Sequence, residues 1–135
     1  MSSIAQNIQE ILSKQNFAVV GASRSPDKFG HQVFFTLKRS GYITFPVNPH
    51  ADVIDGEQVY PTLGSVPSPL DCIVCVVPPE ITVDAIREAS RLHVPYVWIQ
   101  PGAESTEAVE EANSLGMRTV YGGPCIMVEI AIRND

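Results

Sequence analysis

The most informative stretch of the sequence reads Phe17-Ala-Val-Val-Gly-Ala-Ser-Arg-Ser-Pro-Asp-Lys-Phe-Gly30. Its first four residues are apolar and end in two valines, which favours a short buried strand. A polar turn containing glycine follows. After the turn, Val33, Phe34 and Leu37 recur at helical spacing, and Gly41 is well placed to end that helix. The stretch therefore predicts a strand, a turn and a helix in immediate succession.

The same alternation continues along the chain. Further strands are predicted at Ile43–Val47, Asp71–Val77, Tyr96–Ile99 and Arg118–Tyr121, with a weak edge strand near Gln58–Tyr60. Further helices are predicted at about Ile4–Lys14, from Pro79 onward, and from Ser105 or Thr106 to Gly116. Apolar strands that alternate with helices are typical of a parallel sheet covered on both faces. We therefore expect a single α/β domain over residues 1–135, with a three-layer Rossmann-type fold and five to six strands in the order 3-2-1-4-5-6.

Composition narrows the class of protein. The hydrophobic fraction of 44% and the charged fraction of 18% are typical of a globular domain. A net charge of −6 disfavours binding to nucleic acids or acidic membranes. Neither a membrane-spanning run nor a secretory signal is legible, so a cytoplasmic location is expected.

Positive charge is concentrated early in the sequence. Residues 1–50 contain five basic and two acidic residues, whereas the remaining residues contain four basic and thirteen acidic ones. Arg24 and Lys28 fall in the turn after the first predicted strand. In such a turn the backbone amides and the helix dipole favour an anion, and Ser23 adds a hydroxyl. The turn therefore predicts a phosphate site, with an ordinary polar turn as the alternative.

A dinucleotide site is the weaker interpretation of the same turn. Gly21 is followed by serine at position 23, so the Gly-x-Gly-x-x-Gly signature is absent. The second strand ends in Phe45-Pro-Val-Asn-Pro49, without the acidic residue that would bind the ribose of NAD. An NAD(P)-binding, oxidoreductase-like domain nevertheless stays an alternative.

Other strand ends are predicted to meet at the same edge of the sheet. The fourth strand ends in Val77-Pro78-Pro79, an apolar and rigid segment suited to lie against a nucleotide or a pantetheine chain. The fifth strand ends in Gln100-Pro101-Gly102, where an amide can form hydrogen bonds and a glycine permits close approach.

Taken in order, these motifs resemble the small stand-alone coenzyme A-binding proteins, whose domain also forms the N-terminal part of the succinyl-CoA synthetase α subunit. The matching segments are Gly21-Ala22-Ser23, Pro46-Val47-Asn48-Pro49, Gly56–Leu63, Val77-Pro78-Pro79, Trp98–Gly102 and Gly123-Pro124-Cys125. The resemblance implies that the first turn holds the phosphates and that the second and fourth strand ends flank the rest of the coenzyme. The predicted coenzyme-binding residues are Gly21, Ala22, Ser23, Arg24, Lys28, Phe29, Gly30, Val47, Asn48, Pro49, Val77, Pro78, Pro79, Gln100 and Gly102.

The cysteines do not indicate a metal site or a disulfide. Cys72 and Cys75 have Cys-x-x-Cys spacing, but they fall within a strand and should point to opposite faces. Cys125 lies at the predicted rim, where a mixed disulfide with the coenzyme thiol is a further alternative. The resulting prediction is a protein that binds coenzyme A or an acyl-CoA without catalytic activity of its own, since the synthetase's phosphohistidine belongs to a second domain. The sequence does not identify a protein partner.

Overall fold

The structure is a computed structural model that describes residues 3–133. Its strands are β1 (Asn16–Val20), β2 (Ile43–Val47), β3 (Val53–Ile54), β4 (Glu57–Gln58), β5 (Cys72–Cys75), β6 (Tyr96–Ile99) and β7 (Arg118–Val120). Its helices are α1 (Ile4–Leu12), α2 (Phe29–Arg39), α3 (Pro79–Arg91), α4 (Thr106–Ser114) and α5 (Ile126–Arg133), with a 3-10 turn, η1 (Leu63–Ser65). None of the helices described between residues 3 and 133 has the length and apolar character needed to cross a membrane.

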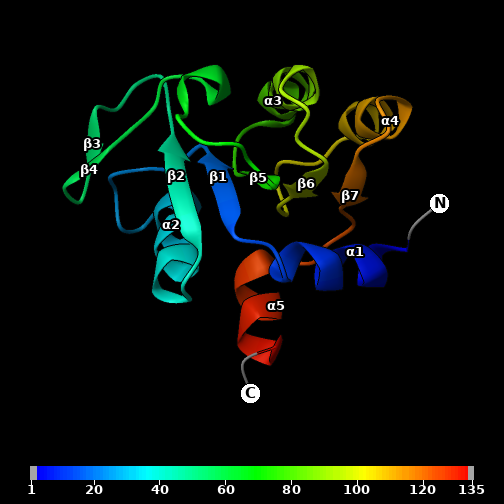
Figure 1. The fold of residues 1–135 in the computed structure, drawn as a ribbon, viewed down its shortest axis with the longest axis horizontal. Helices are drawn as coiled ribbons and strands as arrows, with labels where there is room; N and C mark the ends of the chain where they lie inside the picture. Colours follow the sequence, from blue (N-terminus) through cyan, green and yellow to red (C-terminus); the bar gives the residue numbers. More distant parts are fainter. Residues whose placement is uncertain (1–2, 134–135) are drawn as a thin grey trace.

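Five strands form one parallel sheet in the order β2-β1-β5-β6-β7. This order confirms the Rossmann-type arrangement predicted for the main strands. Because all five strands run in the same direction, their carboxyl ends meet at one edge of the sheet (Figure 1). Val20 of β1 is paired with Val47 of β2 on one side and with Cys75 of β5 on the other.

The predicted edge strand near Gln58–Tyr60 is reduced to one residue at the expected position beside β2. Tyr60 forms only a single parallel bridge with Val47, and β4 instead pairs with β3 in a separate antiparallel hairpin. The cause is the Asp55-Gly56 turn, in which both residues have positive φ (46° and 83°). That backbone conformation folds the chain back on itself in a tight hairpin, so the segment does not extend along β2.

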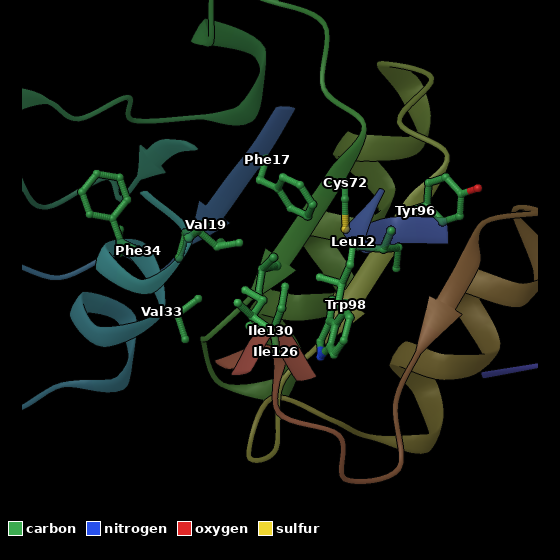
Figure 2. Close-up of a cluster of buried hydrophobic side chains, with 14 of the residues drawn as sticks. Leu12, Phe17, Val19, Val33, Phe34, Cys72, Tyr96, Trp98, Ile126 and Ile130 are labelled. Atoms are coloured by element: carbon green, nitrogen blue, oxygen red, sulfur yellow. The ribbon is translucent and has the colours of Figure 1, made fainter. Parts of the chain in front are cut away.

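Helices cover both faces of the sheet. On one face, α1, α2 and α5 pack against alternate strand residues, and Figure 2 shows Phe17, Val19 and Trp98 within that cluster. On the other face, α3 and α4 pack against the intervening residues, such as Ala18 and Ile73. The near-continuous apolar strands follow from this arrangement, because neither face of the sheet is exposed to water.

The helix α5 was not predicted from the sequence. Ile126 and Ile130 are one turn apart and buried against the sheet, but Val128 and Ile132 on the same helix are exposed. The segment therefore lacks the alternation of apolar and polar faces by which an amphipathic helix is recognised.

Candidate functional site

Two glycines fix where the turn after β1 lies. Gly21 has φ +98°, and a Cβ atom on it would come within 2.3 Å of the Val76 carbonyl oxygen. A Cβ atom on Gly30 would come within 1.9 Å of the Gly21 carbonyl oxygen. The structure gives both glycines a packing requirement, since the ends of β1 and β5 and the start of α2 meet with no room for a side chain.

The start of α2 is open to an anion. Its N-cap residue, Lys28, forms no side-chain capping bond, and the helix begins with Phe29, which is 60% exposed. Among the described residues, the backbone amides of Phe29 and Gly30 have no hydrogen-bond acceptor. These amides point along the helix dipole, so this end of α2 can bind a phosphate.

The turn between β1 and α2 carries positive charge that the protein does not neutralise. Arg24 and Lys28 are exposed, and neither takes part in an ion pair among residues 3–133. Lys38, farther along α2, is paired with Glu57 of the hairpin. The Ser23 hydroxyl oxygen accepts a hydrogen bond from the Ser25 amide at 3.1 Å, which shapes the turn and leaves its own proton free to be donated.

Asn48 connects the end of β2 to this turn. Its side-chain amide donates to the Ala22 carbonyl oxygen at 2.7 Å, and its side-chain oxygen accepts from the His50 amide at 2.8 Å. The Gly21 amide donates to the Val47 carbonyl oxygen at 2.9 Å and adds a second connection. Two strand ends and the turn therefore form one hydrogen-bonded unit.

A pocket of about 420 Å³ opens beside this unit, a size within the usual range for small-molecule sites. Its wall combines residues from the ends of β1, β2 and β5, the segment before η1 and one side of α3. The lining residues are Val20, Gly21, Val47, Asn48, Pro49, His50, Pro61, Thr62, Leu63, Val77, Pro78, Ile81, Asp84, Ala85 and Glu88. Six of the predicted coenzyme-binding residues are in this set.

Charge is distributed unevenly across the site. The pocket wall contains two carboxylates, Asp84 and Glu88, and neither lysine nor arginine lines it. Glu88 also accepts a hydrogen bond from the Gly64 amide at 3.2 Å, which holds η1 against α3. The free positive charge lies instead on the turn before α2. An anionic group is therefore favoured at the turn, and an uncharged group is favoured in the pocket.

The other predicted residues lie outside the pocket. Ala22 is buried behind the turn, and Pro79 is the first residue of α3. Gln100 is only 2% exposed, and its side-chain oxygen accepts from the Ile126 amide at 2.8 Å. Gly102 is exposed in the loop after β6. Gln100 thus has a structural role at the start of α5, and contact of Gln100 or Gly102 with a ligand stays a prediction.

Several pocket residues were missed in the sequence. Ile81, Asp84, Ala85 and Glu88 lie at positions i, i+3, i+4 and i+7 of α3, so they share one side of that helix. Their spacing was legible, but it could not reveal that this side overlooks the ends of β1 and β2. The segment Pro61–Leu63 was noticed only as part of the resemblance.

The cysteines on β5 point to opposite faces, as predicted. Cys72 belongs to the cluster that contains Trp98 (Figure 2), and Cys75 belongs to the cluster on the α3 side. Burial raises the pKa of Cys72 and raises the pKa of Cys75 to about 12. Cys125 is partly exposed, and its sulfur lies 3.4 Å from the side-chain nitrogen of Gln100.

Iodoacetamide at pH 8 is expected to modify only Cys125 in the folded protein. The raised pKa of Cys72 and of Cys75 keeps both as thiols at that pH, and burial excludes the reagent. Intact-protein mass spectrometry should show one adduct in buffer and three in guanidinium chloride. Rapid modification of Cys72 or Cys75 in buffer would contradict the packing described here.

Comparison with known proteins identifies related sequences. A family described as a CoA binding domain matches residues 15–131. The uncharacterized protein YneT of Bacillus subtilis is 32% identical over 126 residues, which cover 93% of each chain. A conserved hypothetical protein of Pyrococcus furiosus has a solved structure with a TM-score of 0.81 and 37% identity, covering 86% of this chain and 99% of that one.

An enzyme subunit is also similar. The α subunit of the ADP-forming acetate–CoA ligase II of Pyrococcus furiosus is 30% identical over 123 residues. These residues make up 83% of this chain but only 27% of the ligase subunit. The similarity therefore concerns one part of a much longer protein.

Proposed function

Because this chain belongs to the family of CoA-binding domains, we propose that it binds coenzyme A or an acyl-CoA at the carboxyl ends of β1, β2 and β5. The observation that carries the proposal is that two surfaces of different chemical character adjoin each other at Gly21. On one side of Gly21 lies a basic turn with free helix amides, and on the other lies a largely apolar pocket. The proposed role is binding, without autonomous catalysis. The activity of the ligase is not transferred, since the match covers 27% of that subunit.

The chemistry of coenzyme A suits this division. Its diphosphate and its ribose 3′-phosphate carry the negative charge, which fits the turn containing Arg24 and Lys28 and the start of α2. The adenine and the pantetheine arm are uncharged, and either group is compatible with a pocket lined by residues such as Val47, Pro49 and Val77. Asp84 and Glu88 disfavour phosphate in the pocket, so they support this orientation of the ligand.

The NAD(P) alternative has less support at the end of β2. An NAD site would be expected to have a ribose-binding carboxylate there, and the residue present is Asn48. Both ends of its side chain already bond to the protein, at Ala22 and His50. The redox alternative at Cys125 stays a prediction. If it is correct, coenzyme A disulfide should add one coenzyme to Cys125, and Cys125→Ser should abolish that adduct while the affinity for reduced coenzyme A is retained.

Coenzyme A is expected to raise the melting temperature of the protein, whereas NAD and NADP are not. A ligand present at about 100 times its Kd stabilises the folded state by about 2.7 kcal/mol. For a chain of this size, that free energy corresponds to a shift of about 10 °C. Differential scanning fluorimetry with each compound measures the effect directly.

Fragments of the ligand serve as internal controls for that measurement. Adenosine 3′-phosphate 5′-diphosphate contains all the phosphates of coenzyme A, including the 3′-phosphate that NAD lacks, and pantetheine contains only the neutral arm. Each fragment should stabilise the protein less than coenzyme A does, since each occupies part of the site. A larger shift with NAD or NADP than with coenzyme A, or no shift with coenzyme A, would overturn the proposal.

A further inference from the structure

The helix α5 has an apolar surface that nothing in residues 3–133 covers. Its inner side chains, Ile126 and Ile130, are buried against the sheet. Its outer side chains Val128 and Ile132 are 53% and 61% exposed. A helix that is apolar on both sides is usually covered on both sides, because exposed apolar area is unfavourable in water.

The exposed side chains of Val128 and Ile132 form an apolar ridge on α5. A groove lies beside this ridge, between α1 and α5. It has a volume of about 410 Å³. From α1 it is lined by Ala5, Ile8, Gln9 and Leu12, and from α5 by Glu129, Ile132 and Arg133. An apolar ridge and an adjacent groove on the same face can fit each other when two identical surfaces meet around a two-fold axis.

We propose that the α1–α5 face binds a second copy of this chain, with the two α5 helices packed antiparallel. The charges on α5 favour this occupant. Glu129 and Arg133 lie one turn apart, on the same side of the stripe formed by Val128 and Ile132. Neither residue forms an ion pair within residues 3–133.

An antiparallel pair satisfies both charges at once. A two-fold axis at the level of residue 131 along α5 brings Glu129 of each copy opposite Arg133 of the other. The surface is thus complementary to itself in shape and in charge, which is the requirement for a symmetric dimer.

The dimer leaves the coenzyme site accessible. Figure 1 shows α1 and α5 on one side of the sheet and α3 on the other. The helix α3 forms one wall of the pocket. The contact is also small, since α1 has nine residues and α5 has eight. Helices of that length span about 12–14 Å, so the interface is smaller than the standard ~800 Å² per partner. We therefore expect a dissociation constant in the micromolar range.

Sedimentation velocity from low micromolar to several hundred micromolar protein tests the dimer. The wild-type protein should pass from monomer to dimer over this range. Ile132→Asp should raise the dissociation constant about tenfold or more, because it places a charge in the apolar contact. Leu115→Asp is the matched control, since Leu115 is 42% exposed at the end of α4 and lies outside this face.

A charge exchange identifies the occupant as a second copy. Glu129→Arg alone should weaken the dimer, because it places two arginines opposite each other across the axis. The double variant, with Glu129→Arg and Arg133→Glu, should restore it, because opposite charges face each other again. Circular dichroism confirms that each variant is folded. A wild-type protein that is monomeric at every concentration, equal dissociation by Leu115→Asp, or failure of the double variant to restore the dimer would each overturn the proposal.

Discussion

Replacing Gly30 with alanine is expected to destabilise the protein by about 3 kcal/mol, which lowers its melting temperature by about 10 °C. In most helices this substitution is favourable by about 0.5–1 kcal/mol, because alanine has less backbone freedom to lose on folding. In this protein the substitution is unfavourable instead, because the new Cβ atom would lie 1.9 Å from the Gly21 carbonyl oxygen. That oxygen is part of the backbone, so it cannot rotate away as the end of a side chain could.

The same substitution should also reduce the affinity for coenzyme A, because relief of the clash moves the start of α2 away from β1. Gly64→Ala is the control. A Cβ atom at Gly64 has only ordinary contacts, the nearest at 3.5 Å, and the change should cost no more than about 0.5 kcal/mol. Thermal denaturation of both variants gives the comparison. A Gly30→Ala protein as stable as the wild type would show that α2 does not pack against β1 as described.

The paired substitutions Arg24→Ala and Lys28→Ala are expected to weaken coenzyme A binding about thirtyfold. Each residue is exposed, and neither has an ion-pair partner among residues 3–133, so both are available to a diphosphate. Two hydrogen bonds to a charged group, reduced by their exposure to solvent, account for about 2 kcal/mol. Affinity should also depend less on salt in the double variant, since screening acts on the contacts that were removed.

A second double variant controls for total charge. Arg39→Ala with Arg91→Ala removes the same net charge from two exposed positions outside the coenzyme pocket and the β1–α2 turn. It should change the affinity by about twofold at most, since neither residue lines the pocket or the turn and salt screens exposed charges that make no direct contact with the ligand. Isothermal titration calorimetry at two salt concentrations distinguishes the loss of direct phosphate contacts from the loss of net charge. If both double variants lose affinity equally, Arg24 and Lys28 do not contact the phosphates.

Local signals explain which elements could be predicted from the sequence. Proline at the first position of α3 and the Ser105 hydroxyl that caps α4 act within a single turn, so both helix starts were predicted correctly. Strand order followed from the alternation of strands and helices. The hairpin and α5 were missed for different reasons. The first depends on the φ angles of Asp55 and Gly56, and the second has apolar residues on both of its sides.

The lining of the pocket could be predicted at the strand ends but not on the wall formed by α3 and η1. Asn48 and Val77 follow β2 and β5, the strands on either side of β1, and a parallel sheet brings such ends to one edge. Ala85 of α3 and Leu63 of η1 meet them only through tertiary packing, which no short motif specifies. The requirement for glycine at position 30 is of the same kind, because the atom that excludes a side chain belongs to residue 21.

The bond from the Asn48 amide to the Ala22 carbonyl oxygen also bears on the rate of binding. It holds the polar turn in shape before any ligand arrives, so association does not have to wait for a loop to close. An unhindered encounter between a small anion and a preformed basic turn can approach the limit set by diffusion. Differences in affinity among acylated forms of the ligand would then arise mainly from how long each form stays bound.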